Sequence, residues 1–170
     1  MSAAVMDQGT RIVDGDSFTS LIEPLLDPAY RLAAVMLNDR PAAEDAVQEA
    51  AIKAWRKVRQ LRDPGAVRPW FLAIVANECR MSRRTRWWSV LKFGDVPSGP
   101  EDRESFTDLH RALLRLAPDE RLPLVLHFYL DLPLDEVARA MHVSPAAAKS
   151  QIYRAAKKLR ADLTVEDVIR

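Results

Sequence analysis

The chain has 170 residues, of which 48% are hydrophobic, and its 25 basic and 24 acidic side chains leave a formal net charge of +1. Its one cysteine, Cys79, excludes an intramolecular disulfide framework. The sequence shows neither a secretion signal nor an apolar run long enough to cross a membrane, so we expect a cytoplasmic protein without membrane insertion.

The small net charge hides separate basic and acidic blocks. Residues 53–92 carry eleven Lys or Arg against two Asp or Glu, and residues 139–160 carry six basic side chains and no acid. Acidic segments precede and separate these two blocks. Segregated charge of this kind predicts two surfaces that face a polyanion rather than a uniformly basic coat.

The first half of the chain is rich in helix-forming residues and shows no alternation with a period of two. Residues 1–16 are polar and aperiodic, so we expect them to be disordered. Pro24 and Pro28 are expected to interrupt the first helix, whereas Pro69 suits the first turn of the third. We predict helices over residues 17–37, 41–60 and 69–88.

The second half begins with a segment that is typical of a linker. Residues 93–104 hold two glycines, two prolines and several acids. Helical patterns follow over residues 105–116, 119–130, 134–141 and 145–163. The fold class predicted is therefore all-α, with two small helical domains, residues 17–92 and 105–170, joined by a flexible acidic linker.

The last two helices predict a helix-turn-helix. Ser144 is a candidate N-cap and Pro145 follows at the first helical position, after a short turn in which His142 would need a left-handed backbone. Ala148 and Ile152 begin the stripe that we expect to be buried. The opposite face can pair with phosphates and reach base edges in a major groove. It presents Lys149, Ser150, Tyr153, Arg154 and Lys157.

The second predicted helix has a polar face with one isoleucine in its middle. The residues on it are Asp45, Gln48, Glu49 and Ile52. A solvated helix face looks like this, and so does a protein-binding patch with a small apolar centre. The pattern alone favours neither interpretation.

The third predicted helix is denser in arginine and tryptophan than a solvated helix end requires. We place Phe71, Ile74, Val75 and Met81 on its buried side. The opposite side can pair with phosphates, bond to base edges and stack on bases. It combines Ala73, Ala76, Asn77, Arg80, Arg84 and Trp87, with Arg83 beside them. A basic helix C-terminus favoured by the helix dipole explains part of this cluster, but not all of it.

Three stretches, in this order, resemble conserved regions of a known family. They are residues 43–56 (AEDAVQEAAIKAWR), 68–80 (RPWFLAIVANECR) and 113–126 (LLRLAPDERLPLVL), the last followed by the helix-turn-helix. They are similar to regions 2.2, 2.3–2.4 and 4.1–4.2 of bacterial σ70 factors. Since only regions 2 and 4 are represented, the chain resembles the extracytoplasmic-function (ECF) subfamily.

This resemblance implies a subunit that binds core RNA polymerase, recognises the minus 35 and minus 10 promoter elements and assists promoter melting. The partners implied are the β′ clamp helices and the β flap of the polymerase, and promoter DNA as duplex and as single strand. An anti-sigma factor is a candidate regulator. No cofactor is expected, and without a metal-ligand cluster, a nucleophile signature or a phosphate-binding glycine loop we do not expect an enzyme.

Residue roles follow from the resemblance where the residues match. Core polymerase binding would fall to Asp45, Gln48, Glu49 and Ile52. The minus 10 element would be bound by Leu61, Arg62, Asn77, Arg80, Arg83, Arg84 and Trp87. The minus 35 element would be bound by Lys149, Ser150, Tyr153, Arg154 and Lys157. Leu61 departs from the family pattern, which often has an aromatic residue at that position.

Two other functions remain open from the sequence. A stand-alone helix-turn-helix regulator would bind duplex operators without polymerase, but it would have no need of the first basic block and its tryptophans. A helical adaptor would instead use its basic faces to bind acidic protein partners.

Overall fold

The computed structural model describes residues 15–93 and 108–169, with side chains described for residues 15–83 and 108–163. Within these ranges the chain forms helices joined by short turns and has no strand, which confirms the predicted all-α class. The predicted linker lies outside the described residues except for Phe93, as do residues 1–14 of the segment expected to be disordered.

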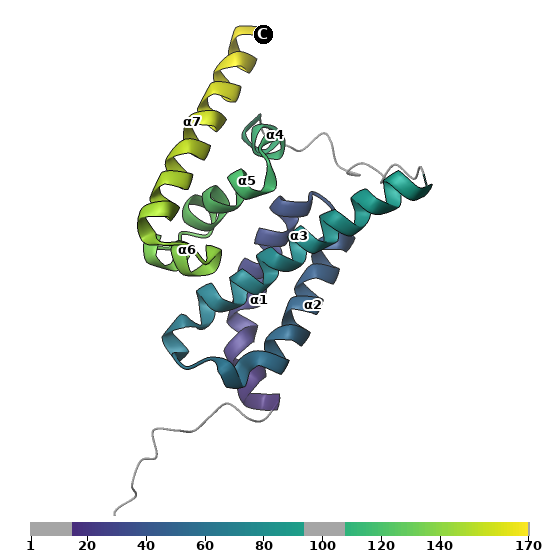
Figure 1. The fold of residues 1–170 in the computed structure, drawn as a ribbon, viewed down its shortest axis with the longest axis vertical. Helices are drawn as coiled ribbons and strands as arrows, with labels where there is room; N and C mark the ends of the chain where they lie inside the picture. The colour runs from purple at the N-terminus through teal and green to yellow at the C-terminus, as the bar shows by residue number, and fades with distance from the viewer. Residues whose placement is uncertain (1–14, 94–107, 170) are drawn as a thin grey trace, which may run out of the picture.

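The first half of the chain forms three helices (Figure 1). They are α1 (Gly15–Leu37), α2 (Arg40–Lys57) and α3 (Val67–Phe93), and the turn between α2 and α3 contains the short 3₁₀ helices η1 (Val58–Gln60) and η2 (Pro64–Ala66). Each of the three helices packs against the other two.

Helix α1 differs from the prediction in one respect, because it continues through Pro24 and Pro28 without interruption. Proline removes one backbone donor from the ladder and leaves the carbonyl four residues earlier without its bond. Those carbonyls belong to Ser20 and Pro24, both exposed, so water can take the place of the missing donors. The buried stripe of α1, which includes Ile22, holds the helix together across both prolines.

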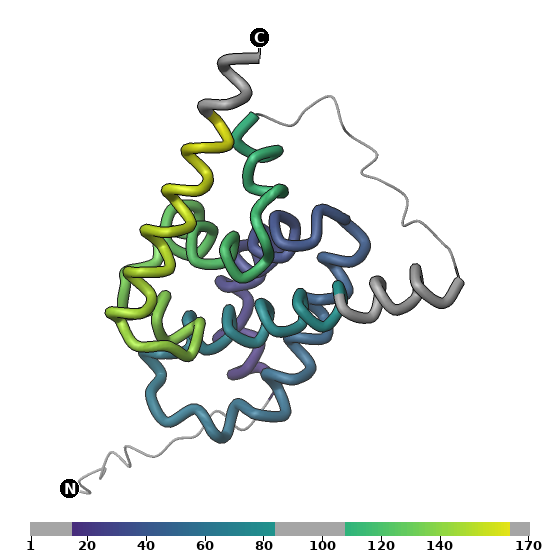
Figure 2. Tube along the Cα trace, turned by 45° about the horizontal axis from the view of Figure 1, so that its top comes forward, coloured from purple at the N-terminus to yellow at the C-terminus, as the bar shows by residue number. Residues whose placement is uncertain are grey.

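The second half forms a more compact group of short helices around one long one. They are α4 (Asp108–Arg115), α5 (Pro118–Leu124), the π-helical turn η4 (Val125–Tyr129), α6 (Leu134–Met141) and α7 (Pro145–Ile169). Figures 1 and 2 show α7 lying beside α4 and α5, with the whole group placed against α1 and α3. The predicted bounds of α6 and the predicted start of α7 are confirmed.

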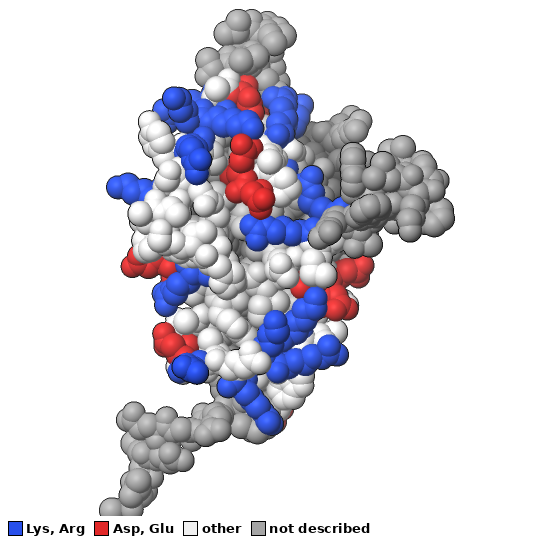
Figure 3. Space-filling model, in the orientation of Figure 1, with Lys and Arg blue, Asp and Glu red and all other residues white. Residues whose placement is uncertain are grey.

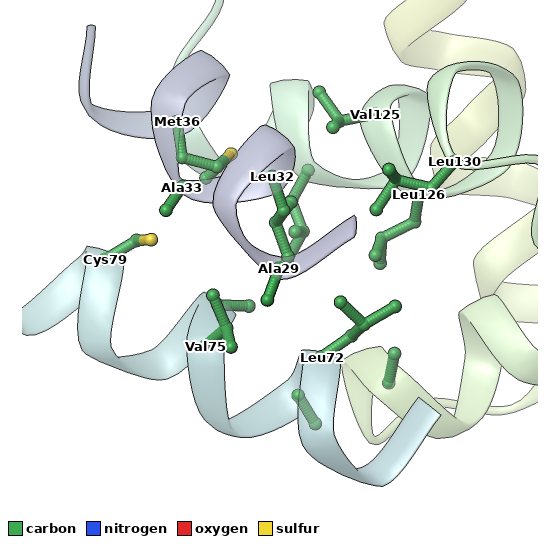
Figure 4. Packing of buried hydrophobic residues seen from close by; sticks show 14 of the residues in the cluster. Ala29, Leu32, Ala33, Met36, Leu72, Val75, Cys79, Val125, Leu126 and Leu130 are labelled. Atoms are coloured by element: carbon green, nitrogen blue, oxygen red, sulfur yellow. The ribbon is translucent and has the colours of Figure 1, made fainter. Parts of the chain in front are cut away.

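The two halves share one continuous hydrophobic core. Helix α6 packs on the N-terminal part of α3, and α4, α5 and η4 contact α1. Figure 4 shows Leu32 of α1 and Leu72 of α3 beside Leu126 and Leu130 of η4. All four side chains are buried and belong to the same cluster. The described structure is therefore closed, with the second half covering part of the first.

Candidate nucleic-acid interface

The turn before α7 has the geometry that a helix-turn-helix requires. His142 adopts φ 56° and ψ 41°, in the left-handed region, and the backbone N–H groups of His142 and Val143 donate to the carbonyls of Arg139 and Ala138. These bonds close the C-terminus of α6. Ser144 Oγ then accepts a hydrogen bond from the Ala147 N–H at 3.2 Å and caps α7. The predicted helix-turn-helix is thus confirmed in its local geometry.

The left-handed conformation of His142 leads to a stability prediction. Because a residue with a Cβ atom is strained in this region and glycine is not, His142→Gly is expected to raise the free energy of unfolding by about 0.5–1 kcal/mol. His142→Val is expected to lower it, since a β-branched side chain fits the region worse. Urea unfolding followed by circular dichroism measures both changes, and a destabilised glycine variant would contradict the prediction.

The exposed face of α7 carries the residues predicted to read duplex DNA. Tyr153 is 71% exposed, and Ala148, Ile152 and Ala155 are buried on the opposite side. The other predicted residues, Lys149, Ser150, Arg154 and Lys157, are all exposed. Contact between the two halves leaves this face open, and Figure 3 shows basic side chains gathered over α7 at one end of the molecule.

The exposed side of α3 brings three of the predicted minus 10 residues together. Asn77, Arg80 and Arg83 are exposed, and Asn77 Nδ2 lies 3.8 Å from Met81 Sδ. Arg80 Nε donates to Asp119 Oδ1 at 2.9 Å, so a carboxylate of α5 already occupies this guanidinium. The side chains of Arg84 and Trp87 lie outside the described residues.

Three positions on α3 were assigned to the wrong side. Met81, predicted to be buried, is 50% exposed, whereas Ala73 and Ala76, predicted to lie on the polar face, are buried. Helix α3 packs against α1, α2 and α6, so its N-terminal half is enclosed on more sides than a helix at the surface of a lone three-helix domain. The correction follows from packing between the two halves, which a single-helix projection does not contain.

The turn between α2 and α3 presents the remaining predicted minus 10 residues. Leu61 is half-buried and Arg62 is exposed. The Leu61 N–H donates to the Val58 carbonyl at 3.1 Å, and Asp63 Oδ1 accepts from the Gly65 N–H at 2.9 Å. These bonds fix the turn locally, which holds Leu61 and Arg62 at one end of α3.

The polar face of α2 is exposed as predicted. Asp45, Gln48 and Glu49 are exposed, and Ile52 is 45% exposed. Within the described part of the chain, no hydrogen bond or ion pair involves these four side chains. The helix begins at an N-cap in which Asp39 Oδ1 accepts from the Ala42 N–H at 2.8 Å. The face is available to a partner without prior breakage of an intramolecular contact.

Sequence reasoning missed the ion pair that joins α2 to α3. Lys53 Nζ lies 2.7 Å from both carboxylate oxygens of Glu78, a residue that is buried. Glu78 and Asp63 are the two acids within the first basic block, which was the available signal. The pair fixes the α2 face that carries Ile52 relative to the α3 face that carries Asn77.

The second missed residue is Arg121, whose guanidinium is buried at the contact between the two halves. Burial, and then the nearby charge of Arg83, lower its pKa to about 10, so it remains charged at neutral pH. His110 lies close by, and burial followed by the charge of Arg121 lowers the pKa of its imidazole. Its Nε2 lies 3.3 Å from Asn38 Oδ1 at the end of α1.

An apolar cavity of about 540 Å³ opens beside this contact. Its walls come mainly from α4, η4 and α7, with Val35 contributed by α1. Phe128 and Tyr129 at its edge are exposed, although both are large and aromatic. An exposed apolar surface of this kind indicates an interaction site.

Two general features of the described residues limit the chemistry of the site. No group of three His, Cys, Asp or Glu side chains among them is placed to hold a metal ion. Burial, and then the neighbouring Glu78, raise the pKa of the Cys79 thiol to about 12, which makes it a poor nucleophile. No helix in the described ranges is both long and apolar enough to cross a lipid bilayer.

Comparisons with known proteins cover both halves of the chain. The model of sigma-70 region 2 matches residues 21–89, and the model of sigma-70 region 4 matches residues 106–159. RNA polymerase sigma factor SigV of Bacillus subtilis is 32% identical over 82% of this chain and 86% of its own length. The RNA polymerase sigma-E factor of Streptomyces coelicolor is 26% identical over 89% of this chain and 88% of its own length.

Two solved structures share the fold. The sigma factor RpoE of Bartonella quintana, in complex with the anti-sigma factor NepR, has a TM-score of 0.72 at 22% identity and covers 88% of this chain and 98% of its own. CnrH, in complex with the cytosolic domain of CnrY, has a TM-score of 0.68 at 21% identity and covers 89% and 90%. By sequence and fold together, the chain belongs to the σ70 family of transcription initiation factors, in its ECF subfamily of RNA polymerase sigma factors.

Proposed function

We propose that this sigma factor binds core RNA polymerase through α2, reads the minus 10 element with α3 and reads the minus 35 element with α7. The observation that carries the proposal is that one molecule exposes two basic reading faces and one uncommitted polar face, each on a different helix. Residues 17–92 and 105–170 would act as the two functional domains. Because core polymerase and promoters are cytoplasmic, the protein would act there.

The α2 face suits docking on the β′ clamp helices. Ile52 provides a small apolar centre, and Asp45, Gln48 and Glu49 surround it with acids and an amide. Carboxylates at the rim would pair with basic side chains of the polymerase and would increase the association rate.

Charge reversal tests this face. Asp45→Lys together with Glu49→Lys is expected to weaken core polymerase binding by about a hundredfold, because two rim attractions become repulsions. Binding is measured by fluorescence anisotropy of the labelled protein against purified core enzyme. The matched control is Asp16→Lys with Glu23→Lys, which changes the net charge equally at two exposed positions of α1. Equal loss in the two double variants would remove α2 from the interface.

The α3 face and the preceding turn suit a melted strand. Arginines at positions 80 and 83 can support the backbone while Asn77 bonds to a base edge, and Leu61 and Arg62 lie where the α2–α3 turn would receive an extruded base. Extrusion costs a few kcal/mol, which contacts in such a turn must recover. Leu61 offers apolar contact there instead of the aromatic stacking common in the family.

The α7 face suits a major groove. Its N-terminal residues Lys149 and Ser150 are placed to meet base edges, while Arg154 and Lys157 are placed to meet phosphates. A stand-alone helix-turn-helix regulator would need this face alone. The separate α3 face favours the sigma-factor assignment over that alternative.

The apolar cavity suits a helix of a protein partner. We assign it to the β flap of the polymerase, with an anti-sigma factor as a competitor for the same surface. Two observations support a regulatory partner: Phe128 and Tyr129 are exposed at the cavity edge, and two proteins of the same fold are found in complexes, RpoE with the anti-sigma factor NepR and CnrH with the cytosolic domain of CnrY.

In vitro transcription tests the function as a whole. Purified core polymerase is incubated with a genomic DNA library, with and without this protein, and transcript starts are sequenced. Starts that depend on the protein and share a two-element motif are expected. Absence of a polymerase complex, or starts without a common motif, would refute the proposed function.

A further inference from the structure

The two halves of this sigma factor are held together by a dry apolar contact. Leu72 and Val75 of α3 and Ala29 of α1 face Leu126 and Leu130 of η4, and all five side chains are buried (Figure 4). Because these residues belong to one cluster, separation of the halves would expose apolar surface from both. The closed arrangement is therefore a stable state of the chain rather than a loose encounter.

Arg121 adds a buried polar contact across the same boundary. Its guanidinium is 2% exposed and donates to three carbonyls of its own half, those of Leu113, Leu114 and Leu116. It also donates to the carbonyls of Val35 at 3.1 Å and Met36 at 2.9 Å, in the last turn of α1. Carbonyls in the last turn of a helix have no partner within the helix and carry the negative end of its dipole. Arg121 thus caps a helix of the other half.

Four further contacts cross the boundary at its rim. Arg68 Nη2 donates to the Leu130 carbonyl at 2.7 Å. His110 contacts Asn38, and the guanidinium of Arg31 lies 5.9 Å from the ring centre of Tyr129. The fourth is the ion pair between Arg80 of α3 and Asp119 of α5.

The Arg80 contact bears directly on DNA binding. Arg80 is a predicted ligand of the minus 10 strand, and in the closed state its guanidinium pairs with the Asp119 carboxylate at 2.9 Å. A carboxylate paired with an arginine occupies the position that a phosphate oxygen would take. The second half of the chain therefore competes with DNA for this arginine.

The spacing of the two promoter elements conflicts with the closed state. Elements centred at minus 10 and minus 35 are about 25 base pairs apart, or about 85 Å along B-form DNA. A compact chain of this length has a radius of gyration of about 15 Å. With α3 and α6 in contact, the α3 and α7 faces cannot reach both elements at once.

We propose that the closed state is autoinhibited: the α4–α7 half acts as an intramolecular inhibitor of the α1–α3 half, occupying Arg80 and preventing simultaneous contact with both promoter elements until core polymerase separates the halves. The proposal rests on the proposed function for its biological meaning. The shared core and Arg121 hold the state closed, while the exposed Arg80–Asp119 pair contributes less to its stability and more to the block.

A distance measurement tests the closed state itself. Spin labels on Lys57→Cys and Ala161→Cys, both exposed, report the separation of α2 from α7 in the full-length chain. The native Cys79 stays in place, since its buried, high-pKa thiol is protected from labelling. A narrow, short distance is expected for the free protein and a longer one after addition of core polymerase. A broad distribution in the free protein, or no change with polymerase, would overturn the proposal.

Variants at the rim connect closure to function. Asp119→Asn combined with Arg31→Ala removes two cross-boundary contacts without altering any residue assigned to polymerase or DNA binding. The open fraction and the rate of association with core polymerase are both expected to rise, roughly two- to fivefold. The matched control, Asp135→Asn with Arg111→Ala, removes the same two charge types at exposed positions that make no described contact with the α1–α3 half. Unchanged helical circular dichroism verifies the fold of both variants.

The two readouts decide between outcomes. Opening with faster association supports autoinhibition, whereas opening without faster association, or faster association without opening, overturns it. The distance measurement on the free protein requires neither polymerase nor DNA. Failure of the wild-type protein to start transcripts would therefore refute the proposed function, while the closed state would still be judged by the distance.

Discussion

Arg121→Met is expected to lower the free energy of unfolding by about 3–5 kcal/mol. Methionine fills much of the same volume but cannot donate, so five buried or partly buried carbonyls lose the donor that serves them. Removal of one partner from a buried charged network costs more than the network contributes, because the remaining groups stay desolvated. Urea unfolding followed by circular dichroism measures the change.

Two further variants separate charge from geometry. Arg121→Lys keeps the charge but replaces a planar fork with one ammonium group, which cannot reach carbonyls from both halves at once, so a loss of about 1–3 kcal/mol is expected. Arg111→Met is the control, since its exposed ion pair with Asp108 contributes less than about 1 kcal/mol. If Arg121→Met cost no more than Arg111→Met, water would serve these carbonyls as well as the guanidinium does.

Local features of the sequence predicted the helix-turn-helix well. The N-cap at Ser144, the proline after it and the left-handed residue at His142 act over a few residues, and the structure confirms each. The buried and exposed sides of α2 and α7 also agree with the projections, because each of these helices has one clearly apolar stripe. The roles assigned to the exposed residues remain predictions.

Long-range packing accounts for what the sequence did not predict. Arg121 lies in a run of charged and proline residues that looks solvated, and only the approach of the end of α1 supplies the acceptors that let it be buried. Ala73 and Ala76 are buried for a related reason, since α3 packs against helices on more than one side. No local pattern encodes contacts between residues more than eighty positions apart.

Reversal of the α3 arginines is the second change with a large expected effect. Arg80→Glu together with Arg83→Glu is expected to reduce promoter opening at least about a hundredfold, because each substitution replaces a phosphate attraction with a repulsion. Opening is measured by permanganate reactivity of thymines at the minus 10 element, in polymerase complexes at fixed salt. Core polymerase binding is measured in parallel by anisotropy.

The closed state sharpens this prediction. Glu at position 80 would face the Asp119 carboxylate, so like charges would weaken the closed arrangement and core polymerase binding should be unchanged or faster while opening is lost. Arg40→Glu with Arg111→Glu is the matched control, because it reverses two exposed arginines away from α3 and should leave opening intact. If reversal at positions 80 and 83 slowed polymerase binding as much as it reduced opening, the α3 face would be a polymerase contact. The minus 10 strand would then have to be read by residues other than these.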